Sequence, residues 1–215
     1  MKSPSKIIKD KDFEMCRKLA WERANPKTAY TSGNVYGDTD SREIQNFFNN
    51  FIGTLNEFAW CCYFLTEIFM ADDSRRGDGG GMDLMAGPYG MATRGTVWSG
   101  PINLLKHMKP AESDRGDTLP RAYPEDVDMI SLGHVVPDKN FKFDEKYEKN
   151  FLRAPGCDSC RVILRAWMWA GEWEVYARIN GVKPFTGLSH YVDLKQMRQD
   201  VVELKEMAMP EAKLL

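Results

Sequence analysis

Three positions carry side chains whose type and setting could support chemistry. Glu57 lies within the apolar helical segment Gly53-Thr-Leu-Asn-Glu57-Phe-Ala-Trp, Asp83 ends the segment Gly-Gly-Gly-Met-Asp83, and Arg94 lies on the next apolar run. Carboxylates bind divalent cations, and a guanidinium binds phosphate or a carboxylate. An ionised carboxylate in an apolar helix is costly without a partner. Glu57 is therefore either an acid of a metal or active site or a residue of a solvated stripe, and the sequence leaves both interpretations open.

The segment around Asp83 and Arg94 predicts a β-hairpin. Residues 82–86 and 91–98 are apolar enough for strands, and residues 87–90, Gly-Pro-Tyr-Gly, are typical of a turn. The polar, glycine-rich residues 72–81 lead into this hairpin.

A four-residue turn would pair Ala86 with Met91 and would set the register of the hairpin. Asp83 would then lie opposite Arg94, and alternation along the strand would put Ala92 on the same face. The hairpin is therefore predicted to gather an acid, a base and a small residue on one side of the sheet.

The elements that must position these residues are predicted from apolar periodicity. The pattern indicates one α+β (α/β-like) domain over residues 12–209, with a mixed central β-sheet flanked by helices, after a loose arm at residues 1–11 and before a tail at residues 210–215. The expected elements are helices at residues 12–25, 41–70 and from Asp193, and strands at 102–107, 127–136, 161–169 and 173–179.

Composition limits the classes of function. The 215 residues are 43% hydrophobic, and 29 Lys and Arg against 31 Asp and Glu neither favour nor exclude a nucleic-acid partner. Five cysteines without a secretory signal indicate a reducing, cytoplasmic compartment rather than a disulfide framework. No apolar run approaches the roughly 18–20 residues that span a bilayer, so no membrane association is expected.

Other patterns have simpler structural interpretations. Cys157 and Cys160 have metal-ligand spacing, but no second pair accompanies them, which disfavours zinc. The tryptophans between residues 167 and 173 are typical of a core, although with Arg165 they could also stack on nucleic acid.

The helix with Glu57, the Gly-Gly-Met-Asp83-Leu segment, the strand near Arg94 and Leu104-Leu105-Lys106 together resemble a phage-type member of the PD-(D/E)xK (restriction-endonuclease-like) nuclease superfamily. This resemblance implies a helix Glu, a strand Asp and an (Asp/Glu)-x-Lys on the neighbouring strand. It implies Mg²⁺ or Mn²⁺ held by Glu57 and Asp83, a catalytic or phosphate-binding Arg94, and Lys106 or Lys109 along the path of DNA. The location implied for a phage-encoded member is the host cytoplasm.

The sequence departs from that pattern because Ala92-Thr93-Arg94 stands in place of (Asp/Glu)-x-Lys. Ala92 offers no metal oxygen, and Arg94 keeps its charge without shuttling a proton. Three explanations remain open: a degenerate nuclease that only binds, an active enzyme with a relocated ligand such as Asp78 or Asp73, or a catalytic acid replaced by Ala.

Two hypotheses of function follow. The first is a metal-dependent DNA nuclease or a nuclease-derived DNA-binding protein, and the second is an inactive module that binds DNA or another protein. Because Ala92 and Arg94 are expected to face Asp83, Ala92→Glu with Arg94→Lys is predicted to create Mg²⁺-dependent cleavage.

Overall fold

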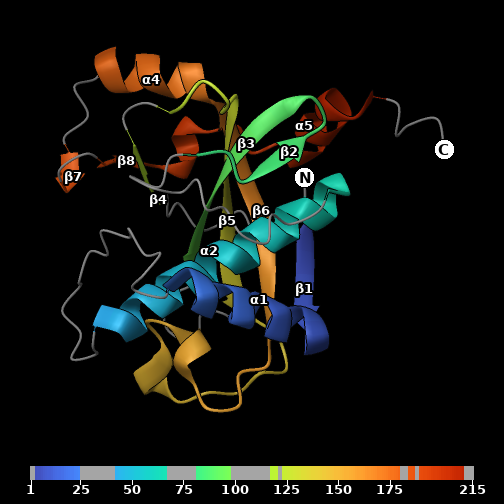
Figure 1. Cartoon of the computed structure of the whole chain (residues 1–215), viewed down its shortest axis with the longest axis vertical. Helices are drawn as coiled ribbons and strands as arrows, with labels where there is room; N and C mark the ends of the chain where they lie inside the picture. The colour runs from blue at the N-terminus through green and yellow to red at the C-terminus, as the bar shows by residue number, and fades with distance from the viewer. Residues whose placement is uncertain are drawn as a thin grey trace.

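The computed structural model describes residues 3–24, 42–66, 81–97, 117–120, 123–179, 184–186 and 189–210. Within these residues it is a mixed α+β structure (Figure 1). The fold class predicted from the sequence is confirmed at this level.

A five-stranded mixed sheet forms the centre of the described structure. Its strands, in spatial order, are β1 (Ser5–Lys9), β6 (Ser159–Trp169), β5 (Met129–Pro137), β3 (Tyr89–Val97) and β2 (Leu84–Ala86). Only the β3–β5 pair is parallel, and the other three pairs are antiparallel. A separate three-stranded sheet has the order β4 (Asp117–Pro120), β8 (Ser189–Val192) and β7 (Pro184–Thr186).

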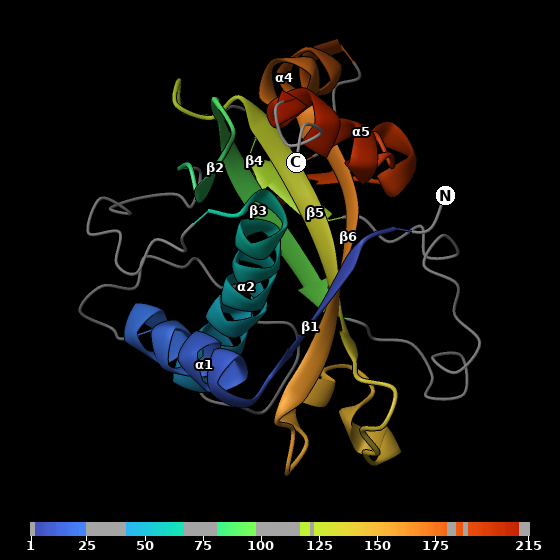
Figure 2. The same ribbon diagram turned by 90° about the vertical axis from the view of Figure 1, so that its right-hand side faces the viewer.

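Two helices cover one face of the central sheet. Helix α1 (Asp10–Ala24) packs on α2 (Arg42–Phe64), and α2 packs on the strands, as Figure 2 shows from the side. Helix α5 (Val201–Ala208) adds to the core formed there, which we call the first core, and contributes Val201, Leu204 and Ala208. Helix α4 (Ala170–Ile179) belongs to a second core on the opposite face, where Trp173 packs with Ile130 and Leu132. The sheet is therefore buried on both faces over β3, β5 and β6.

Helix α2 approaches the sheet closely because two strand positions lack a side chain. A Cβ added at Gly133 on β5 would overlap Oδ1 of Asn56, and one at Gly95 on β3 would lie 2.9 Å from the carbonyl oxygen of Ile52. Asn56 is fully buried. The residue that follows it is Glu57, so the same close approach carries Glu57 down towards the strands.

The structure corrects two predicted elements. Residues 5–9, assigned to a loose arm, form β1, whose Ile8 is fully buried and which pairs with β6. Residues 173–179, predicted as a strand, belong to α4, where Trp173 and Ala177 are buried one helical turn apart. Ala170-Gly171-Glu172, which lies between the two predicted strands, begins this helix.

Other predicted elements are confirmed where the structure describes them. The strands expected at residues 127–136 and 161–169 are β5 and β6, and the first two helices are α1 and α2. The closing helix begins later than Asp193: residues 194–196 form a short 3₁₀ turn, and α5 begins after Asp200, whose Oδ1 accepts hydrogen bonds from Val202 N and Glu203 N. The strand expected at residues 102–107 lies outside the described residues.

The close packing of α2 on Gly95 and Gly133 leads to a stability prediction. Gly133→Ala is expected to lower the free energy of unfolding by about 1–3 kcal/mol, because the added methyl group overlaps buried Asn56. Gly53→Ala on α2, where a Cβ meets nothing within 4 Å, is the matched control and should stabilise by about 0.5–1 kcal/mol. Urea denaturation of both variants measures the difference, and equal effects would contradict the close approach.

Candidate functional site

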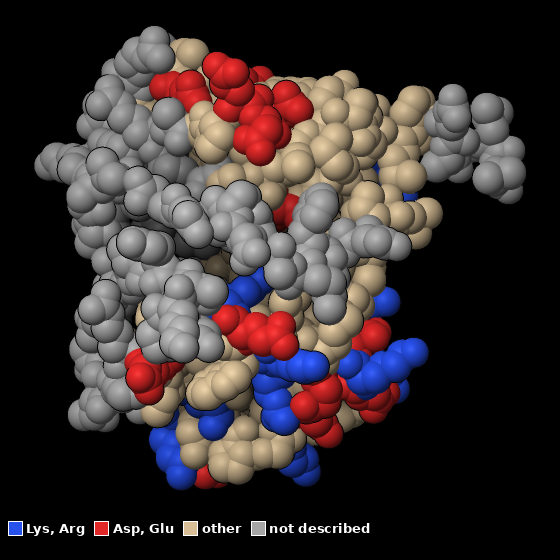
Figure 3. All heavy atoms as spheres, in the orientation of Figure 1, with Lys and Arg blue, Asp and Glu red and all other residues tan. Residues whose placement is uncertain are grey.

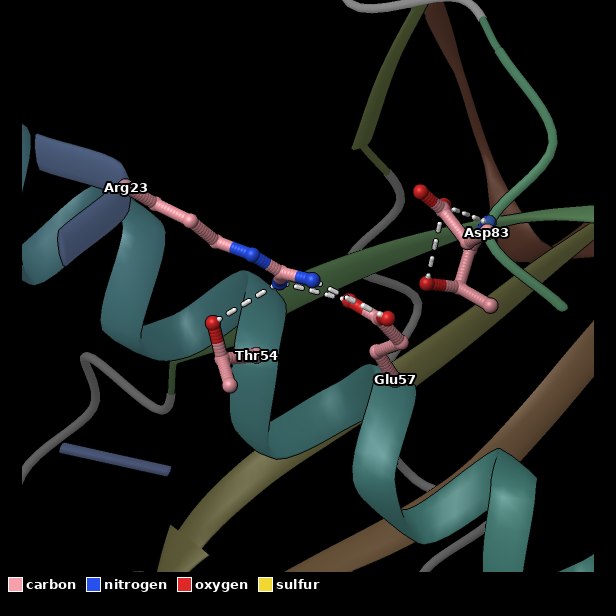
Figure 4. Close-up of polar contacts among 5 residues, drawn as sticks. Arg23, Thr54, Glu57 and Asp83 are labelled. Atoms are coloured by element: carbon pink, nitrogen blue, oxygen red, sulfur yellow. Dashed lines mark hydrogen bonds and ion pairs between the residues drawn. The ribbon is translucent and has the colours of Figure 1, made fainter. Parts of the chain in front are cut away.

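Glu57 is buried and bound by an arginine from the neighbouring helix. Its side chain is among the least exposed charged groups, at 2%. Arg23, in the last turn of α1, donates from Nη1 to Oε2 at 2.6 Å and from Nη2 to Oε1 at 3.2 Å (Figure 4). Arg23 Nη1 also donates to Thr54 Oγ1 at 3.1 Å, one turn before Glu57 on α2. The interpretation of Glu57 as part of a solvated stripe is therefore wrong.

Two nearby acids, Glu57 and Asp83, stabilise the charged form of Arg23. Burial alone would lower the pKa of this guanidinium, but the hydrogen bond and charge of Glu57, together with the charge of Asp83, raise the pKa above its ordinary value. Both carboxylates therefore act on one cation. Figure 4 shows Arg23, Glu57 and Asp83 reaching towards the same region from α1, α2 and the segment before β2.

Asp83 lies immediately before β2 and forms hydrogen bonds with the edge of β3. Its backbone N donates to Met91 O at 2.8 Å, and its Oδ2 accepts from Thr93 N at 2.7 Å and from Thr93 Oγ1 at 3.2 Å. In an antiparallel ladder the N–H of Thr93 would meet a carbonyl of the next strand. The carboxylate of Asp83 takes the place of that carbonyl, which explains how an 8% exposed acid is satisfied.

The hairpin has a tighter turn than the sequence analysis assumed. The strands pair Ala86 with Tyr89 and Leu84 with Met91, so Gly87 and Pro88 alone form the connection. Gly87 has φ of +61°, and proline fixes a negative φ at the second position, as a two-residue II′-type turn requires. The predicted pairing of Ala86 with Met91 is wrong, and with it the placement of Asp83 opposite Arg94.

The two faces of β3 have different neighbours. Met91 belongs to the first core, Gly95 lies against α2, and Thr93 between them binds Asp83, so these three face Glu57. Ala92 belongs to the second core. Arg94 also lies on that side, with its guanidinium carbon 6.0 Å from the centroid of the Tyr123 ring, which packs on the second core. The prediction that Ala92 and Arg94 share a face with Asp83 is wrong, so its consequence for Ala92→Glu with Arg94→Lys loses its basis.

Several predicted site residues lie outside the described part of the chain. These are the proposed DNA-path residues Lys106 and Lys109 and the alternative ligands Asp73 and Asp78. Their roles stay predictions, as does phosphate binding by Arg94.

The described residues around Glu57 and Asp83 do not fit a divalent metal. Mg²⁺ requires near-octahedral oxygen ligands at about 2.0–2.1 Å. Here the guanidinium of Arg23 binds both oxygens of Glu57, and Asp83 Oδ2 already accepts from Thr93. Within the part of the chain that the structure describes, no group of three or more His, Cys, Asp or Glu could hold a metal ion.

The cysteines near this region are free thiols with low acidity. Burial, followed by the charges of Asp12 and Glu57, raises the pKa of Cys16 to about 12. Burial and the charge of Glu57 also raise the pKa of Cys61 to about 12. Cys157 donates from Sγ to Ser159 O at 3.7 Å, and burial raises its pKa to about 11. All three are poor nucleophiles at neutral pH.

The sequence analysis missed Arg23, Thr54 and Thr93. A buried carboxylate needs a cation, which was the one available signal. It did not say which cation, because Arg23 and Glu57 lie 34 residues apart in the chain. Only the packing of α1 on α2 brings them together.

Fold and site together define a mixed α+β protein that buries a carboxylate–guanidinium pair between two helices and a second carboxylate at the edge of β3. Comparisons with models of known families, with curated proteins and with solved structures found no match. Among the described residues, no helix has both the length and the apolar character needed to cross a membrane.

The contrast between two Glu–Arg pairs generates a prediction. Glu57→Gln should lower the free energy of unfolding by about 3 kcal/mol, because it leaves the largely buried Arg23 without its carboxylate. Glu172→Gln removes the partner of Arg198 from a pair whose side chains are 46% and 40% exposed, and should cost under about 1 kcal/mol. Chemical denaturation of both variants is the measurement, and similar losses would show that burial of the Glu57 pair contributes little.

The thiols give a second prediction, on pH. Folded Cys16 and Cys61 keep their protons to higher pH than unfolded thiols with pKa near 9.0, so their contribution to stability is lost as pH rises from about 9 towards about 12. In Cys16→Ala with Cys61→Ala, unfolding free energy should depend less on pH over that range. At about pH 8 both thiols should resist iodoacetamide while folded and react once the protein is denatured, as mass spectrometry can report.

Proposed function

We propose that this protein is a nuclease-derived DNA-binding protein that binds its partner without hydrolysing it. The proposal joins the resemblance to the PD-(D/E)xK superfamily with the geometry of β3. One acid on a helix and one before a strand lie on the same side of a mixed sheet, as that resemblance implies.

The observation that carries the proposal is the identity of the β3 residues on the face of the two acids. An (Asp/Glu)-x-Lys pair on that face would occupy positions 91 and 93, and these positions hold Met91 and Thr93. Met91 is fully buried, and a thioether is a poor ligand for Mg²⁺. The Thr93 hydroxyl donates to Asp83 and carries no charge that could stabilise a departing group. This geometry favours binding over metal-assisted hydrolysis.

The distribution of charged side chains on the surface is relevant to where DNA would bind. On the face seen in Figure 3, most Lys and Arg of the described residues lie in the lower part, mixed with Asp and Glu, and a group of Asp and Glu without Lys or Arg lies at the top. DNA affinity that depends on phosphate contacts needs a local excess of cations. We assign the DNA path to the segment carrying Lys106 and Lys109 on the sequence resemblance.

A protein partner is the second candidate, and one observation favours it. Trp21 on α1 is 63% exposed although its ring contacts Phe47, with centroids 5.2 Å apart. Exposed aromatic side chains are enriched where proteins meet. Absence of DNA binding in the experiment below would favour this candidate.

The direct test combines binding and cleavage. Labelled duplex and single-stranded DNA should bind in EDTA, with affinity that falls as salt rises from about 50 to 200 mM. Plasmid DNA incubated with Mg²⁺ or Mn²⁺ should stay intact. Ala92→Glu with Arg94→Lys should also leave it intact, because both side chains face the second core. Nicking by the unmodified protein that disappears in Asp83→Asn would overturn the proposal in favour of a metal-dependent nuclease.

The assignment of the DNA path gives a further prediction. Lys106→Ala with Lys109→Ala should weaken binding to all sequences alike and reduce the slope of log affinity against log salt by about 2. Lys139→Ala with Lys142→Ala, at exposed positions of the described surface, is the matched control and should leave the slope unchanged. Fluorescence anisotropy over a salt series measures both.

A further inference from the structure

We propose that Arg23 is a built-in counter-cation that takes the place of a divalent metal at the Glu57–Asp83 site. The inference goes beyond DNA binding and does not depend on it, because it rests on the contacts of α1 with α2. It concerns how this protein compensates the buried charge of Glu57 beside a second acid, Asp83.

The first step is the electrostatic demand of the site. Glu57 is 2% exposed and Asp83 is 8% exposed, so both carboxylates have lost most of their hydration. Buried charges persist when a cation or several hydrogen bonds compensate them. Asp83 has two hydrogen bonds from Thr93, whereas both carboxylate oxygens of Glu57 accept from Arg23.

The second step is the fit of Arg23 to that demand. A planar guanidinium matches a carboxylate with two parallel N–H donors, and here both oxygens of Glu57 are bound. Thr54 accepts a further hydrogen bond and so fixes the plane of the group. The Arg23 side chain is 13% exposed, so solvent screens the pair weakly.

The third step is the disagreement between this arrangement and a metal ion. A divalent ion bound to Glu57 would have to displace the guanidinium, because two cations repel each other in one buried site. Arg23 lies in the last turn of α1, so its displacement would break the contacts of α1 with Thr54 as well as with Glu57. The charge of Glu57 is therefore balanced from within the chain, Asp83 is satisfied by Thr93, and metal should add nothing to the folded state.

Removal of the guanidinium should reverse this preference. In Arg23→Met the two acids keep their places while their shared cation is lost. A divalent ion then becomes the available source of positive charge, and an ion that binds only the folded state raises its stability.

The experiment is thermal unfolding of the full chain in EDTA and in millimolar Mg²⁺ or Mn²⁺. The Tm of the unmodified protein should not change with metal. The Tm of Arg23→Met should fall on the order of 10 °C in EDTA and recover by several degrees, saturably, with Mn²⁺. Arg23→Met with Glu57→Gln should show no recovery. Arg17→Met, on the same helix at a 52% exposed side chain, is the matched control and should be unaffected by metal.

Three outcomes would overturn the inference. Metal-dependent stabilisation of the unmodified protein that is lost in Asp83→Asn would show that the native site takes a metal. A Tm loss in Arg23→Met no larger than in Arg17→Met would show that the pair does not neutralise the site. A Tm loss in Arg23→Met that no divalent ion reverses would show that Arg23 forms an ordinary ion pair with Glu57 and does not take the place of a metal.

Two further measurements keep the test decisive. If Arg23→Met fails to fold, calorimetric titration of the unmodified protein with Mn²⁺ still tests the inference, because measurable binding that Glu57→Gln abolishes contradicts it. DNA binding in EDTA is scored separately, so loss of DNA binding would refute the proposed function while leaving this inference intact.

Discussion

The buried ion pair between Arg23 and Glu57 is the constraint on which the described structure depends. An ionised carboxylate on the inner side of α2 is tolerated because a guanidinium binds both of its oxygens and also donates to Thr54. This requirement fixes where the end of α1 must lie relative to the middle of α2. Hydrophobic contacts between the helices, such as the edge-on packing of Phe13 on Phe51, determine how tightly they pack but could tolerate a shift. Such a shift would break the paired hydrogen bonds between Arg23 and Glu57.

The depth of that pair is set by the sheet. Gly95 and Gly133 remove the side chains that would hold α2 away from β3 and β5, and Asn56 fills the space they leave. Glu57 is therefore carried below the surface by glycines on two strands that are distant from it in sequence. The hairpin adds the second acid, because a two-residue turn at Gly87 and Pro88 brings Asp83 level with the unpaired edge of β3. Two independent local features thus place two carboxylates on one side of the sheet.

The sequence predicted the elements better than the relations between them. Apolar periodicity identified α1, α2, β5 and β6, because each is long enough to show its period clearly. It missed β1, since five residues with one fully buried side chain give little pattern. The register failed for a different reason: Gly87-Pro88-Tyr89-Gly90 contains both a two-residue and a four-residue turn, and local sequence does not decide between them. In the observed register Asp83 is hydrogen-bonded to Thr93, whereas the predicted register placed it opposite Arg94.

The partner of Glu57 could not be predicted because it is a property of packing, and its identity decides what the acids can do. A metal ion presents open coordination positions, so acids that hold one can bind and polarise a phosphate at the same time. A guanidinium bound to Glu57 and Thr54 offers the acids charge without that reactivity. The same two carboxylates therefore become part of the scaffold when Arg23 reaches them. The pair itself then holds α1 against α2, which packs on the sheet.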